Sequence, residues 1–144
     1  MSAGDNKKMV RQFYDEVINK GNLRAIDKLL AENFVDHSLV PGLPHGVEGV
    51  KQSFTMLRKG FPDARVTIKD LIVEGDKVVT RATMHGTNKG EFMGTPATGK
   101  KVTVEVIDVF RLSRGKAVEH WGLWDAMGMM QQLGAVPPPA QQRK

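Results

Sequence analysis

The feature that most constrains the fold of this chain is a change in the spacing of its apolar residues at Phe61-Pro62-Asp63. Before this point, apolar side chains recur every three or four residues, a spacing that predicts amphipathic helices. After it, they recur at every second residue, which predicts strands with one buried face. Because proline lacks an N–H group and biases the preceding residue toward extended geometry, the last helix of the first part ends here. Helices followed by strands predict an α+β domain with the helices on one face of the sheet.

Three helices are expected in the first part. The apolar stripe from Met9 to Ile18 predicts the first, which ends at Gly21-Asn22. Leu23 to Leu30 predicts a short second helix, and Val47 to Leu57 a third. Residues 34–37 are expected to lead from the second helix into a loop.

The second part predicts an antiparallel meander. The expected strands cover residues 66–73, 78–87, 101–112 and 116–123, and a last helix covers 126–133. The apolar residues change phase within the first strand, which predicts a bulge near Asp70. Glu74-Gly75-Asp76 is a hairpin turn, and residues 88–99 form a long connection. The bulge and the glycines favour a curved sheet, which under helices encloses one pocket.

The length and composition are those of a single domain without disulfides. Residues 1–136 of the 144 are expected to form it, and residues 137–144, which begin with three prolines, a disordered tail. The chain has no cysteine and therefore neither a disulfide nor a thiolate site.

The charge and hydropathy patterns bear on partners and location. The net charge of +5 comes from scattered lysines and arginines, without a basic stripe between aromatic residues, so no nucleic-acid partner is expected. No apolar run approaches membrane-spanning length, and the N-terminus lacks the apolar core of a signal peptide. We therefore expect a cytoplasmic protein with no membrane partner.

Asp108 is out of place among apolar residues. It shares one face of the strand 101–112 with five apolar side chains. A carboxylate in this register is either paired with a buried donor or placed for chemistry. Because Ile107 and Val109 lie on the other face, Asp108 could also lie at a pocket mouth or at a subunit contact.

His120 lies on the strand that follows the Asp108 strand in a hairpin. Cross-strand neighbours have Cβ atoms about 5 Å apart, so His120 could come close to the inward face of that strand. A histidine near a carboxylate can titrate near neutral pH and pass a proton. The alternative is a core histidine with one hydrogen bond and no chemical role.

Asp125 precedes the last helix, at the position of an N-cap. There a carboxylate accepts backbone N–H bonds, which keep it ionised. The residues alone leave the cap and an acid/base role open. The remaining histidines, His37, His45 and His85, are far apart and show no metal-ligand spacing, so no metal site is expected.

Several short motifs occur together in a characteristic order. They are Phe34-Val35-Asp36-His37, residues 46–51 (GVEGVK), Phe110-Arg111-Leu112, residues 115–121 (GKAVEHW), Asp125-Ala126-Met127-Gly128 and Gln131-Gln132-Leu133-Gly134. From Lys7 to Gly134, they resemble the SnoaL-like polyketide cyclases and ester cyclases of the NTF2-like superfamily.

The resemblance implies a cone-shaped NTF2-like fold, with a curved antiparallel sheet packed against three N-terminal helices around a mostly apolar pocket. It implies an intramolecular aldol reaction that needs no cofactor and no metal, with Asp125 as the acid/base. His120 lies in the same motif. Where these cyclases carry a histidine on the long strand, this chain has Asp108, which changes the oxyanion that the pocket can stabilise.

We therefore expect an acid/base enzyme for a hydrophobic carbonyl-bearing small molecule, with Asp125, His120 and Asp108 as catalytic residues. The expected substrate-binding residues are His37, Phe54, Phe92, Trp121, Trp124 and Met127. A non-catalytic ligand-binding module on the same fold and an epoxide-hydrolase-like hydrolase are the alternatives. A homodimer through the outer face of the sheet is also expected.

Overall fold

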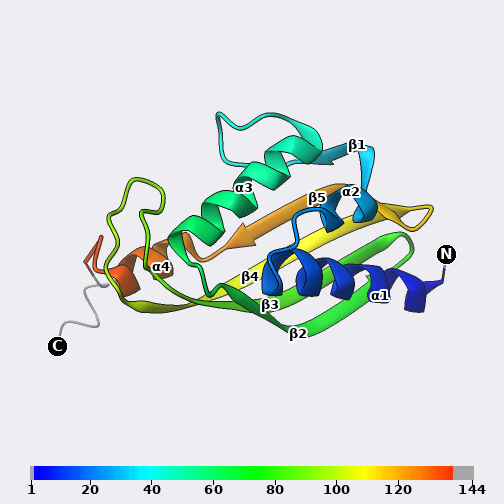
Figure 1. Ribbon diagram of the computed structural model, residues 1–144. Helices are drawn as coiled ribbons and strands as arrows, with labels where there is room; N and C mark the ends of the chain where they lie inside the picture. The colour runs from blue at the N-terminus through cyan, green and yellow to red at the C-terminus, as the bar shows by residue number, and fades with distance from the viewer. Residues whose placement is uncertain (1, 138–144) are drawn as a thin grey trace.

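The computed structural model describes residues 2–137. It shows a five-stranded sheet with helices on one side (Figure 1). In chain order, the elements are α1 (Ala3–Phe13), the π-helical segment η1 (Tyr14–Asn19), α2 (Ala25–Leu29), β1 (Leu30–Asp36), α3 (Gly46–Gly60), β2 (Arg65–Glu74), β3 (Lys77–Thr87), β4 (Lys101–Ser113), β5 (Lys116–Trp124) and α4 (Ala126–Leu133). The sheet order is β1-β5-β4-β3-β2. All but the first residue of the expected tail lies outside the described residues. Within these residues, no helix is long and apolar enough to cross a membrane.

The predicted α+β class is confirmed, with three helices preceding the four strands of the meander. The register of β2 against β3 shifts between Ile68 and Asp70, where the bulge is expected. Helix α4 covers the predicted residues and ends at Gly134, whose φ of 80° is the left-handed conformation of a helix C-cap.

Strand β1 corrects the prediction of a purely antiparallel sheet. Leu30–Asp36 pairs in parallel with β5, so the sheet is mixed. Its two buried residues, Leu30 and Phe34, are four positions apart instead of alternating. That spacing fits a helix as well as a strand, and Glu32 between the two residues is exposed, which is why the sequence pattern does not predict this element.

Helix α1 is longer than its apolar stripe predicts. Ser2 and Asp5 form a reciprocal capping box at its start. At its end, the helix widens into the π-helical turn η1, which begins at Tyr14. Wide turns of this kind are frequent at functional sites, and this one sets Tyr14 against the sheet.

The core lies between the helices and the inner face of the sheet. One buried cluster joins α1, η1 and α2 to the sheet, with Phe13, Val17 and Phe110 among its members. A second cluster, which includes Phe61 and Met129, closes the end of the sheet near α4. Figure 1 shows α1 and α3 on the same side of the sheet, with α4 at one end beside the 88–100 loop. The space between these helices and the strands holds the cavity described next.

Candidate active site

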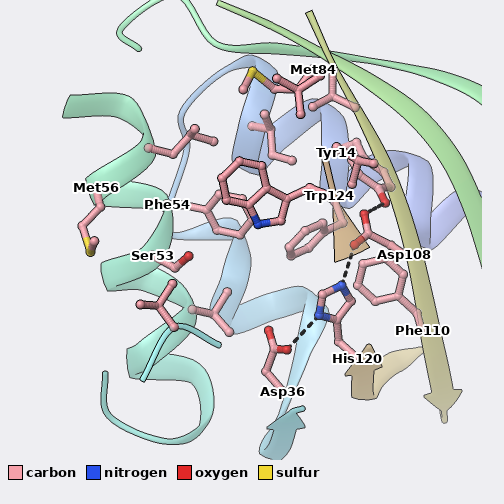
Figure 2. Close-up of a pocket in the computed structure, with 18 of the residues that line it drawn as sticks. Tyr14, Asp36, Ser53, Phe54, Met56, Met84, Asp108, Phe110, His120 and Trp124 are labelled. Carbon is pink, nitrogen blue, oxygen red and sulfur yellow. Dashed lines mark hydrogen bonds and ion pairs between the residues drawn. The ribbon is translucent and has the colours of Figure 1, made fainter. Parts of the chain in front are cut away.

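A cavity of about 210 Å³ lies between α3, the α1–η1 helix and the inner face of the sheet. Apolar side chains make up most of its wall (Figure 2). A cavity of about 150 Å³ already holds benzene, so this one has room for a somewhat larger organic group. Four apolar residues of the wall are also 36–47% exposed, namely Val40, Met56, Met93 and Trp124. The cavity therefore opens to solvent through an apolar mouth.

The cavity contains a chain of hydrogen bonds that runs through four polar side chains (Figure 2). The Tyr14 hydroxyl donates to Oδ2 of Asp108. Nε2 of His120 lies 2.8 Å from Oδ1 of Asp108, and Nδ1 lies 2.9 Å from Oδ1 of Asp36. One histidine thus joins two carboxylates.

The strand register brings these groups together. Asp108 pairs with Gly122 and Phe110 pairs with His120, so His120 is a diagonal neighbour of Asp108 on the inner face. On its other side, His120 pairs with Asp36 at the end of β1. A Cβ on Gly122 would lie 2.7 Å from Oδ1 of Asp108 and 2.8 Å from Cε1 of His120, so only glycine leaves room for their contact.

Tyr14 and Thr80 close the inner end of the chain. Thr80 pairs with Asp108 across β3 and β4, and its hydroxyl lies 2.5 Å from that of Tyr14. Both residues are at most 2% exposed. Burial, followed by the charge of Asp108 and the hydrogen bond to it, raises the pKa of Tyr14. Tyr14 therefore stays protonated and acts as a donor.

His120 is a cation in this setting. Burial on its own would lower its pKa, but the hydrogen bonds to Asp108 and Asp36 and the charges of these carboxylates raise the pKa of His120 from 6.5 to about 9. At pH 7 both ring nitrogens carry protons, one for each carboxylate. With both carboxylates ionised, the group of three has one net negative charge.

Asp36 is bound on one side only. Its Oδ1 accepts hydrogen bonds from His120, from the Ser38 amide at 3.0 Å and from the Ser38 hydroxyl at 2.8 Å. Figure 2 shows its other oxygen, Oδ2, directed into the cavity. Burial raises the pKa of Asp36, but the hydrogen bond and charge of His120 and the Ser38 bonds outweigh it, so this pKa lies below its ordinary value. Asp36 thus offers an ionised oxygen to the cavity.

Two hydrogen-bond donors of the wall take no part in this chain. Ser53 lies on α3, and Figure 2 shows the indole nitrogen of Trp124 turned into the cavity. No lysine or arginine occurs among the described residues that line the cavity. The cavity thus combines two carboxylates joined by the His120 cation, neutral donors and apolar walls, which suits a neutral carbonyl compound.

Five of the residues expected from the sequence lie in the cavity wall. They are Asp108, His120, Phe54, Phe92 and Trp124. The hairpin that joins β4 to β5 brings the first two within hydrogen-bond distance, as the expected cross-strand proximity requires.

Four expected residues lie outside the cavity. Trp121 is adjacent to His120 in β5 and faces the opposite side of the sheet, where it stacks on His37 with ring centroids 4.8 Å apart. Met127 is 61% exposed on α4. Asp125 is also exposed, and its Oδ1 accepts the Gly128 amide at 2.8 Å as the N-cap of α4. Of its two interpretations, the cap is the one that the structure shows.

Sequence reasoning missed Tyr14 and Asp36 as site residues. A signal for Tyr14 exists, because a tyrosine inside an apolar helix stripe needs a partner for its hydroxyl. Asp36 belongs to the motif Phe34-Val35-Asp36-His37, but its place beside His120 was not predicted, because β1 was not predicted. The described residues contain no group of three or more side chains placed to hold a metal ion.

Comparisons with known proteins identify the family and the fold. Residues 8–133 match the family model of the SnoaL-like polyketide cyclases. Aklanonic acid methyl ester cyclase DauD from Streptomyces sp. (strain C5) is 24% identical over 142 residues, which cover 89% of this chain and 88% of that protein. The structure of TsrD from Streptomyces laurentii superposes with a TM-score of 0.87 at 30% identity, covering 94% of this chain and 99% of TsrD. The fold is NTF2-like, and the chain belongs to the SnoaL-like polyketide cyclase family.

Proposed function

We propose that this protein is a cofactor-independent acid/base enzyme that closes a ring in a hydrophobic carbonyl compound by an intramolecular aldol reaction. The observation that carries the proposal is the one-sided binding of Asp36, which presents a free, ionised Oδ2 to an apolar cavity. The relative DauD is named for the cyclisation of aklanonic acid methyl ester, a neutral ester.

In this proposal, Asp36 is the general base. Its lowered pKa makes it a weak base, so the proton that it removes must be an acidic one, on a carbon between two carbonyl groups. Oδ2 takes this proton, and the resulting enolate carbon attacks a second carbonyl carbon of the same molecule. A C–C bond forms, and the attacked carbonyl becomes an alkoxide that receives the proton back from Asp36. No proton is gained or lost overall.

The surrounding groups support the charge that moves. His120 and Ser38 hold the carboxylate, while Asp108 and Tyr14 hold His120 in turn. The hydroxyl of Ser53 and the indole N–H of Trp124 are placed to donate to the enolate oxygen. Such donors act strongly in an apolar cavity, because water does not compete with them.

The test compares Asp36→Asn with Asp125→Asn, using aklanonic acid methyl ester and neutral aryl β-keto esters as probes. We expect Asp36→Asn to lower kcat by about 10²–10⁴-fold, the contribution of a general base, while the Kd of the ester changes little. Asp125→Asn is the matched control, because asparagine caps a helix as well as aspartate does, and it should keep wild-type turnover.

The other outcomes identify the alternatives. If Asp125→Asn is inactive and Asp36→Asn is active, the base is Asp125. If the wild type binds the esters but releases neither cyclised nor hydrolysed product, the protein is a binding module. A product that takes up ¹⁸O from labelled water would indicate a hydrolase.

A further inference from the structure

The end of β1 contains a contact that the proposed reaction does not by itself explain. Strand β1 ends at Asp36, and the His37 amide still donates to the His120 carbonyl at 2.9 Å, as in a parallel ladder. The next amide of β5 on this side, that of Gly122, donates to the hydroxyl of Ser38 at 3.0 Å. A side chain therefore takes the place of a backbone carbonyl at this point of the sheet edge.

Ser38 uses the same hydroxyl for a second bond. Its Oγ donates to Oδ1 of Asp36 at 2.8 Å, and its amide donates to the same oxygen at 3.0 Å. Since His120 also donates to Oδ1, one oxygen of Asp36 receives three hydrogen bonds. Because the Gly122 amide holds the Ser38 hydroxyl in place, the carboxylate cannot rotate without breaking its bonds to Ser38 and His120.

We infer that Ser38 is a positioning residue that holds Asp36 by Oδ1, so that Oδ2 alone faces the substrate. This inference rests on the proposed role of Asp36 as the base. The hydroxyl of Ser38 makes the carboxylate one-sided and weakens it as a base, and both effects favour a substrate with an acidic C–H group. A carboxylate free to rotate would offer either oxygen and would spend part of the time turned away from the cavity.

A titration of Asp36 must be distinguished from the titration of the charged groups around it. His120 contacts it from β5, with Asp108 of β4 and Tyr14 of η1 behind. From the β1–α3 loop, His37 and His45 line an outer hollow that Asp36 also lines. All of these groups are kept in a Ser38 variant. The Ser38 hydroxyl also lies 3.4 Å from Nδ1 of His120, so a difference between variant and wild type reports on the contacts of this hydroxyl with Asp36 and His120 together.

The first readout does not need turnover. Protein labelled with ¹³C at the aspartate carboxyl carbons is titrated by NMR, and the signal missing in Asp36→Asn assigns Asp36. We expect the pKa of Asp36 to rise in Ser38→Ala, because a bond to its charged form is lost, and to return toward the wild-type value in Ser38→Thr, which restores a hydroxyl. Ser53→Ala, which removes a hydroxyl from the opposite wall, should leave the Asp36 titration unchanged.

The second readout is the pH profile with aklanonic acid methyl ester. We expect Ser38→Ala to lower kcat about 10- to 100-fold with little change in KM, as misplacement of a catalytic group does, and to move the acid limb of kcat/KM to higher pH. An Asp36 titration that is the same in folded Ser38→Ala and in the wild type would overturn the inference. A shifted titration together with full activity of Asp36→Asn would leave the Ser38 contact intact and refute the proposed base instead.

Discussion

His120 lies between two carboxylates, and this makes the stability of the fold depend on pH. Its pKa is raised from 6.5 to about 9, so the folded state holds a proton that the unfolded state has lost over this range. A raised pKa stabilises the fold fully below pH 6.5, and the stabilisation is lost as the pH rises through about 9. A difference of this size corresponds to about 3 kcal/mol, since each pKa unit is worth about 1.4 kcal/mol.

We therefore expect the free energy of unfolding to fall by up to about 3 kcal/mol between pH 6.5 and 9. Denaturant titrations with urea at a series of pH values measure this change. His120→Gln should flatten the dependence in this window. His85→Gln is the control, because His85 is exposed and lies outside the cavity, and this variant should keep the wild-type slope. An equal slope in His120→Gln would show that the cation between the carboxylates is not its source.

Single residues also show how far sequence reasoning reaches. Alternation along two adjacent strands is enough to place Asp108 and His120 on one inner face, because the hairpin fixes which strands are neighbours. Asp36 could not be placed in this way. It meets His120 only through the pairing of β1 with a strand more than eighty residues later, and local spacing carries no information on that partner.

At the scale of the element, β5 contributes a glycine, Gly122, on which the geometry of the site depends. Gly122 leaves the space in which His120 and Asp108 meet, and its amide holds Ser38. We expect Gly122→Ala to push these side chains apart, to lower the His120 pKa toward 6.5, and to cost about 1–3 kcal/mol through overpacking. NMR titration of His120 and urea denaturation measure the two effects separately.

A second strand glycine provides the control. A Cβ on Gly86 of β3 would lie 3.1 Å from Phe61, away from the polar chain. Gly86→Ala should therefore cost stability through crowding but leave the titration of His120 unchanged. If both variants shift the His120 pKa alike, the effect comes from general loosening and not from the space at Gly122.

The elements also differ in how well they could be predicted. Strand β4 and helix α4 have regular apolar periods and were placed within about a residue of their ends. Strand β1 lacks a regular alternation of buried residues, because only its parallel partner on one side and α3 above it determine which residues are covered. The neighbours of an edge strand, not its own period, decide its fold.

At the scale of the whole molecule, the outer face of the sheet is the surface that the helices leave uncovered. It carries an apolar patch formed by Ile72, Val79, Ile107, Val109, Trp121 and Leu123, which pair across β2 to β5. Of these, Leu123 is 80% exposed, Ile72 59% and Ile107 50%. Exposed apolar patches that are ringed by polar residues mark contact surfaces, and here the ion pairs Asp70–Arg81 and Arg111–Glu119 lie beside the patch.

The expected homodimer through this face stays a prediction, and its test is the sedimentation of the wild type and of two variants. A second copy would cover the same patch on both chains, as a two-fold interface requires, so one charge introduced there is introduced twice. We expect the wild type to sediment as a dimer and Leu123→Asp as a monomer. Met127→Asp is the matched control, since Met127 is 61% exposed but lies on α4, away from the patch.

A monomeric wild type would exclude the dimer, and a dimeric Leu123→Asp would place its interface elsewhere. Because Leu123 faces away from the cavity, a monomer that keeps its turnover would show that each chain holds a complete active site.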